Sequence, residues 1–172
     1  MNDFWFAFWF FLPAGIANAS PVFFNKIPLI NRWDTPLDFG KSLNGKRIFG
    51  DNKKWRGLIG GVLIGALGAG FIYSWQNLLP GTNHVLLGGL MGFGALIGDS
   101  LESFIKRQFG KKPGEKWFPF DQTDYIIGGL LASLILINFE LKIYLFILML
   151  YFGLHLIASY IGYLIKLKDY PI

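Results

Sequence analysis

Five long runs without a charged residue constrain the fold of this chain more than any other feature. A helix needs about 20 apolar residues to cross the hydrocarbon core of a bilayer, so the runs predict an all-α integral membrane protein. The third run continues in helical register past Asp99. We expect five transmembrane helices in a single domain spanning residues 1–172, at about residues 4–25, 57–79, 85–107, 122–139 and 143–165.

The first run has an alternative interpretation as a cleaved signal peptide. The small residues ANAS at positions 17–20 resemble a cleavage site. A signal peptide begins with basic residues, however, whereas this chain begins with Asp3 and has no Lys or Arg before Lys26. We therefore expect the first helix to be retained.

The basic residues predict how the helices are oriented. Of the 16 Lys and Arg residues, eight lie at 26–56, five at 106–116 and two in the tail, Lys166 and Lys168, which leaves only Lys142 on the other side. By the positive-inside rule the N-terminus lies outside, while both long loops and the C-terminus are cytoplasmic. The role of basic residues in setting topology and their attraction to anionic lipid headgroups account for much of the net charge of +5. We expect no nucleic-acid partner.

The third helix carries two carboxylates before it ends. At about 100° per residue, Asp99, Glu102 and Lys106 lie within about 80° of the small residues Gly88, Gly92 and Ala95. The pair could be neutralised at the helix end by Lys106 and Arg107, but carboxylates are too short to snorkel as Lys does. Charged groups inside a span usually mark a functional cavity. We expect a site here, with Gly92 and Ala95 bordering a lateral path for a lipid.

A second acidic pair, Asp121 and Asp124, lies where the fourth helix is expected to begin. Asp121 suits the N-cap position and Asp124 the third helical position, so capping by itself is one explanation. A capped carboxylate is also a preorganised ligand. Oxygen ligands suit Mg²⁺, which takes a few carboxylates together with water and phosphate oxygens. The chain has no cysteine, which excludes thiolate metal sites. The predicted metal ligands are Asp99, Glu102, Asp121 and Asp124.

Both long loops combine glycine with clustered cations. They contain GKRIFGDNKKWRG at 45–57 and KRQFGKKPGEKW at 106–117. Flexible backbone with several cations suits a polyphosphate, which Arg binds bidentately and Lys as a point charge. With acidic pairs on the same membrane face, the loops predict a Mg²⁺-nucleotide site. The expected nucleotide ligands are Asp51, Asn52, Lys53, Arg56, Arg107, Lys111 and Lys112, and Lys106 joins the four carboxylates as a catalytic candidate.

Two segments resemble the CDP-archaeol synthases, the archaeal-type relatives of CDP-diacylglycerol synthases. GDSLESFIKRQFGKKPGEKWFPFDQTDY at 98–125 is similar to that family's G-D-x-x-E-S-F-x-K-R, basic loop and D-Q-x-D, and LDFGKSLNGKRIFGDNKKWRG at 37–57 resembles its first cytoplasmic loop. Together they cover about a third of the chain. Lys54 departs from the pattern, which has a Thr there. The resemblance implies cytidylyl transfer from CTP to a membrane lipid phosphate, giving a CDP-activated lipid and pyrophosphate.

Several alternatives remain open from the sequence. A CDP-diacylglycerol synthase acting on phosphatidic acid would need the same residues, since the tail-lining residues do not distinguish ether from acyl chains. A small ion or proton transporter would use Asp99 and Glu102 as a relay, but such carboxylates should lie near the midplane with access to both faces. A CDP-alcohol phosphotransferase would need a D-G-x-x-A-R run, which the chain lacks. A homodimer is an open alternative to a monomer.

Overall fold

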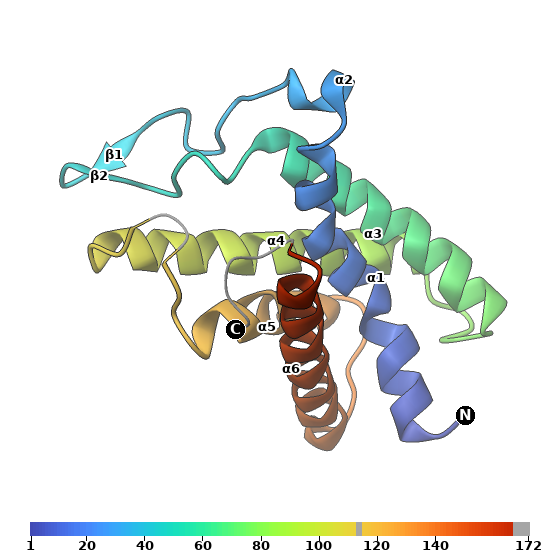
Figure 1. The fold of residues 1–172 in the computed structure, drawn as a ribbon. Coiled ribbons are helices and arrows are strands. Elements are labelled where there is room, and N and C mark those ends of the chain that lie inside the picture. Colours follow the sequence, from blue (N-terminus) through green and yellow to red (C-terminus); the bar gives the residue numbers. More distant parts are fainter. Residues whose placement is uncertain (113–114, 167–172) are drawn as a thin grey trace.

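The computed structural model describes residues 1–112 and 115–166, so Gly114 and Lys168 lie outside the described residues. Helices dominate it (Figure 1). A small hairpin, β1 with β2, lies in the loop before α3, where Ser42 pairs with Arg47. The elements are α1 (Asp3–Phe24), α2 (Pro28–Asn31), β1 (Ser42–Leu43), β2 (Lys46–Arg47), α3 (Trp55–Trp75), α4 (His84–Gln108), α5 (Phe120–Ser133) and α6 (Leu141–Leu164).

Four helices among the described residues are long and apolar enough to cross a membrane: α1, α3, α4 and α6. The expected helix at 122–139 is shorter, because α5 ends at Ser133 and the chain continues in turns over residues 134–136. Its 14 residues extend about 21 Å, less than the roughly 30 Å of a hydrocarbon core. The boundaries expected for the four spans agree with the structure to within a few residues.

Helices α3 and α4 run antiparallel and touch through glycine. A Cβ on Gly65 would lie 3.3 Å from the Cα of Gly92, and one on Gly92 would lie 3.2 Å from the Cβ of Ala17 in α1. Ala95 is fully buried. The expectation that Gly92 and Ala95 border a lateral lipid path is therefore wrong. Small residues on this face allow α1, α3 and α4 to pack closely.

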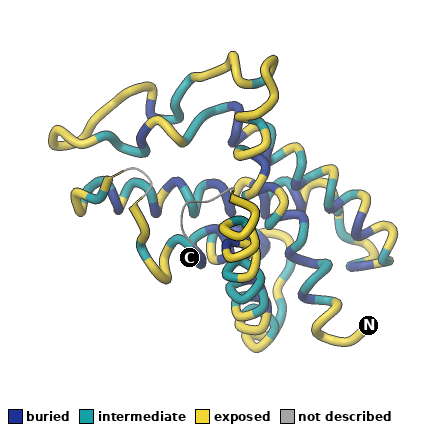
Figure 2. The backbone as a smooth tube through the Cα atoms, viewed as in Figure 1, coloured by how far each residue is buried: buried dark blue, intermediate teal, exposed yellow. Residues whose placement is uncertain are grey.

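An aromatic core joins α1 to its neighbours. Phe10, Phe11 and Tyr73 are fully buried, and the Tyr73 hydroxyl donates to the backbone carbonyl of Phe10. Tyr151 of α6 donates to the carbonyl of Phe8 at 2.6 Å, which ties α6 to α1. Most of α6 is otherwise exposed or half-buried, as Figure 2 shows. Since its exposed side chains are mainly apolar, this surface suits contact with lipid.

Candidate functional site

Close contact between α4 and α5 creates the acidic cluster. A Cβ on Gly98 would touch the backbone carbonyl of Asp124 and lie 3.3 Å from the Cα of Gly128. Only glycine allows the two backbones to approach this closely, so Asp99 and Asp124 are brought together by the residues beside them. One carboxylate oxygen each from Asp99, Glu102 and Asp124 lies within 4.8 Å of the others. Three of the four predicted metal ligands thus form one cluster.

The fourth carboxylate, Asp121, lies beside this cluster and holds a lysine. Lys106 Nζ lies 2.5 Å from Asp121 Oδ1 and 3.4 Å from Glu102 Oε1. The other Asp121 oxygen accepts the backbone N–H of Trp117 at 2.8 Å. Pro119, not Asp121, occupies the N-cap of α5, so the predicted capping position is wrong by two residues. Asp121 instead orients a nearly buried cation.

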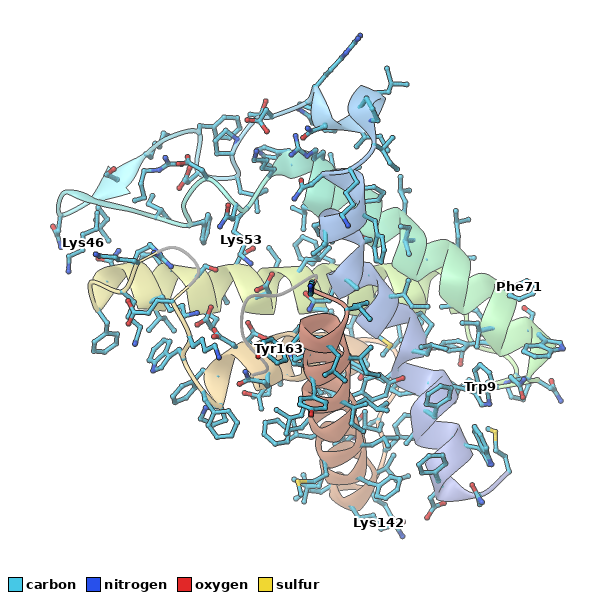
Figure 3. The ribbon with its side chains drawn as sticks, in the orientation of Figure 1. Trp9, Lys46, Lys53, Phe71, Lys142 and Tyr163 are labelled. Carbon is cyan, nitrogen blue, oxygen red and sulfur yellow. The ribbon has the colours of Figure 1, made fainter. Side chains whose placement is uncertain are left out.

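The loop before α3 reaches the cluster through Lys53 and contacts the end of α4 through Lys46. Lys53 forms an ion pair with Asp99. Lys46 donates to the carbonyl of Gln108 at the end of α4, at 2.6 Å. Figure 3 shows both lysines on the loop that lies along α4. The structure therefore brings Lys53, predicted from the sequence to bind nucleotide, directly to the acidic cluster.

Arg56 has a different environment from the other predicted nucleotide ligands. Its side chain is only 3% exposed. The guanidinium donates to the carbonyls of Asn31 and Trp33, both at 2.8 Å, to Asp34 at 2.9 Å and to Asn25 Oδ1 at 2.8 Å. These bonds tie the start of α3 to the end of α1. Arg56 thus lies apart from the cluster and orders the loop.

The remaining predicted nucleotide ligands lie in the loops before α3 and after α4 and in the last turn of α4. Asp51 is exposed and pairs with Arg47 at 2.6 Å, while Asn52 lines a cavity beside Lys53. Arg107 donates to the carbonyl of Lys111 at 2.6 Å, and Lys111 pairs with Glu115 at 2.8 Å. The backbone N–H of Lys112 donates to the same Glu115 carboxylate. The Lys112 side chain has no recorded bond among the described residues.

Asp38 organises the first loop, a role that the sequence analysis missed. Its side chain is fully buried and accepts from the Arg47 guanidinium and from the backbone N–H groups of Phe49, Gly50 and Gly40. Burial by itself would raise the pKa of this carboxyl, but these hydrogen bonds outweigh it and lower the pKa to about 2. The signal in the sequence is the Asp-Phe-Gly run at 38–40, because an Asp side chain often accepts from the backbone N–H two residues further on.

Comparison with known proteins identifies the family. The model of the CarS-like CDP-archaeol synthases matches residues 1–172. The CDP-archaeol synthase of Pyrococcus abyssi (strain GE5 / Orsay) is 35% identical over 178 residues, covering 99% of each chain. That of Methanoculleus marisnigri (strain ATCC 35101 / DSM 1498 / JR1) is also 35% identical, covering 93% of this chain and 99% of its own. The chain belongs to the CDP-archaeol synthase family.

A solved structure agrees with this assignment. It is an intramembrane enzyme for archaeal membrane lipid biosynthesis, 28% identical, with a TM-score of 0.76. The match covers 89% of this chain and 92% of that one. The family predicted from the two loop segments is confirmed, and membership supports cytidylyl transfer from CTP in archaeal lipid synthesis.

For a CDP-archaeol synthase, the acidic cluster offers a suitable set of metal donors. Its three carboxylates supply only oxygen ligands, which hard divalent cations prefer. Glu102 Oε1 is buried and has no hydrogen-bond partner, since its 3.4 Å contact with Lys106 lacks hydrogen-bond geometry. The ion pair with Lys106 leaves this buried oxygen without a hydrogen bond, and coordination to a metal ion would stabilise it. The residues present therefore fit a metal ion.

Proposed function

We propose that this protein transfers the cytidylyl group of CTP to an archaeal-type dialkylglycerol phosphate, with Mg²⁺ held by Asp99, Glu102 and Asp124. The observation that carries the proposal is the cluster of these three carboxylates within 4.8 Å, flanked by Lys53 and Lys106. A site that must bring two anions together needs this combination of anionic metal ligands and cations.

The chemistry is a displacement at the α-phosphorus of CTP. An oxygen of the ionised lipid phosphate forms the new P–O bond, and the bond from the α-phosphorus to the bridging oxygen of the β-phosphate breaks, releasing pyrophosphate. The nucleophile is already ionised, so the protein needs no general base to activate it. Mg²⁺, when bound, supplies neutralisation of phosphate charge. Lys53 and Lys106 stabilise the negative charge that develops on the transferred group and on the leaving pyrophosphate.

Other residues position Lys106, bind the nucleotide and order the loop that carries Lys53. Asp121 positions Lys106, because it holds the Nζ atom at 2.5 Å. Asp51, Asn52, Arg107, Lys111 and Lys112 hold the nucleotide, and the position of Asn52 beside Lys53 supports this role. Arg56 contributes indirectly, by keeping the Lys53 segment attached to α1.

The site lies at the cytoplasmic end of a five-span bundle, with the N-terminus outside and the C-terminus inside. The fifth crossing is α5 together with the turns that follow it, over residues 120–139. Support comes from the ends of the helices: Trp9 of α1 contacts Trp75 of α3, and Figure 3 shows Trp9 and Phe71 far from Lys46 and Lys53. Aromatic residues of this kind are typical of a membrane interface.

Pyrophosphate release tests the proposal. Purified protein in detergent is supplied with CTP, Mg²⁺ and either a dialkylglycerol phosphate or phosphatidic acid. We expect release only when lipid phosphate and Mg²⁺ are both present, with one CDP-lipid formed per pyrophosphate and with faster turnover of the ether lipid. Absence of release with both lipids would reject the proposal, while faster turnover of phosphatidic acid would reassign the lipid.

A further inference from the structure

A cavity of about 300 Å³ lies between α1, the start of α3 and α4, next to the acidic cluster. Lys53, Lys54 and Asp99 line its polar end. Its other walls include the apolar side chains of Pro21, Val22, Leu58 and Leu96. The cavity is thus charged on one side and apolar on another, which matches an amphiphile better than a nucleotide.

Asn18 of α1 also lines this cavity, and its side-chain oxygen is buried without a hydrogen-bond partner. Two other polar groups there have partners within the part of the chain that the structure describes. Asn25 accepts from Arg56 at 2.8 Å, and Ser100 donates to the carbonyl of Leu96 at 2.7 Å. Because that oxygen is buried, a molecule in the cavity would contact Asn18 through its NH₂ group, which forms no hydrogen bond among the described residues.

The depth of Asn18 indicates what that partner is. Asn18 lies two turns before Asn25 along α1, or about 10 Å further from the cytoplasmic loop. A lipid phosphate reacting near Asp99 places its glycerol oxygens deeper than its phosphate, with its tails continuing into the bilayer. CTP enters from the cytoplasm and has no alkyl chain to continue from this cavity into the bilayer.

We propose that Asn18 positions the lipid substrate by donating a hydrogen bond from its side-chain NH₂ group to a glycerol linkage oxygen. The inference rests on the proposed function and names the residue that recognises the lipid end of the reaction. Ether and ester linkages both offer an oxygen that accepts from this NH₂ group. Asn18 is thus a positioning residue that recognises the glycerol linkage and leaves the reacting phosphate to the cations.

The test is Asn18→Leu, which keeps the size of the side chain but removes its hydrogen bonds. We expect the apparent KM for dialkylglycerol phosphate to rise about tenfold, the effect of losing one net hydrogen bond. The KM for CTP and the thermal unfolding midpoint should stay at wild-type values. Asn138→Leu is the matched control, because Asn138 lines a separate apolar cavity between α5 and α6 and should change neither KM. Asn18→Ser, which retains a donor, should give an intermediate lipid KM.

Each result decides for or against the inference. A lipid KM for Asn18→Leu equal to that of the wild type rejects it. So does a joint loss of CTP affinity and thermal stability, which would make Asn18 a packing residue. If Asn18→Leu fails to fold, Asn18→Ser and Asn18→Ala decide, since the proposal requires their lipid KM values to rise in that order. A wild-type protein without lipid-dependent turnover would reject the proposed function itself, which is a separate outcome.

Discussion

Asp99 and Asp124 are carried by helices whose backbones touch, whereas Lys53 is carried by a loop that polar side chains hold in place. At the helix contact, Gly98 lies against the backbone of Asp124, and nothing larger fits. In the loop, Asp38 and Arg56 each gather several hydrogen bonds and fix the segment that contains Lys53. The acidic half of the site thus depends on steric contact and the cationic half on polar contacts.

This difference predicts different responses to substitution. Packed backbones cannot relax far, so a change at the helix contact should displace the carboxylates and destabilise the protein together. A loop anchored by hydrogen bonds can lose one bond and still occupy the site for part of the time. Loop substitutions should therefore produce graded changes in affinity.

The largest effect is expected for the helix-borne carboxylates. Asp99→Asn and Asp124→Asn remove anionic charge from the proposed metal site and should lower turnover about 100- to 1,000-fold, while both variants remain folded. Pyrophosphate release over a Mg²⁺ titration measures the loss. Asp3→Asn, at an exposed carboxylate in the first turn of α1, is the control and should retain most activity. Near-normal turnover of either variant at saturating Mg²⁺ would remove that residue from the metal site.

Next in size is the effect of filling the contact between α4 and α5. Gly98→Ala places a methyl group against the Asp124 carbonyl, and overpacking of this kind costs about 1–3 kcal/mol. We expect both the thermal unfolding midpoint and turnover to fall. Gly153→Ala is the control, because a Cβ there has no neighbour within 4 Å and should not destabilise α6. Unchanged turnover in Gly98→Ala would show that the carboxylates do not depend on this contact.

A smaller, more selective effect is expected in the loop. Lys53→Ala removes the cation that pairs with Asp99, and we expect the KM for CTP to rise about tenfold, in line with a charge-assisted hydrogen bond. Lys41→Ala removes an exposed cation outside the GDNKKWRG segment and should change the KM less. Steady-state kinetics at saturating lipid compares the two variants. Equal effects would indicate that the loop acts only as a diffuse basic surface.

The smallest effect concerns the order of the loop at low pH. The folded pKa of Asp38, about 2, is below the ordinary value of 3.8, so its contribution to stability is fully present above that ordinary value. The contribution is lost as the pH falls from about 4 through about 2. Pepsin cleavage between residues 38 and 50 should therefore increase over this range. Asp38→Asn should be cleaved at an equally high rate at pH 4 and pH 2, and a wild-type-like pH dependence in that variant would exclude Asp38 as the cause.

Several features of the fold and site follow from local sequence. The long apolar runs predict α1, α3, α4 and α6 closely, because the cost of burying unpaired backbone groups in lipid leaves helix as the favoured structure. Helical periodicity alone places Asp99, Glu102 and Lys106 on one face. These predictions need no knowledge of the neighbouring helices. For α5 the same reasoning gave an end at residue 139, six residues beyond the observed end at Ser133.

Contacts between distant residues could not be predicted in the same way. A glycine stripe indicates a close neighbour but does not name it, so Gly92 and Ala95 were assigned to a lipid path, although Gly92 packs against α1 and α3 and Ala95 is fully buried. Arg56 and Lys53 are near neighbours in one basic segment, yet one is buried among carbonyls and the other pairs with Asp99. Composition cannot distinguish them, because each environment consists of groups from elsewhere in the chain.

The sequence by itself determined the membrane class, the long helices, the family and the residue types of the site. Tertiary structure alone decided that Asp99, Glu102 and Asp124 form the cluster while Asp121 holds Lys106, and that Asn18 faces a cavity without a partner. The physical reason is how far apart along the chain the interacting residues are. Helix formation and membrane partition depend on residues within a few turns of one another, whereas the position of a carboxylate relative to another helix depends on how closely two backbones approach.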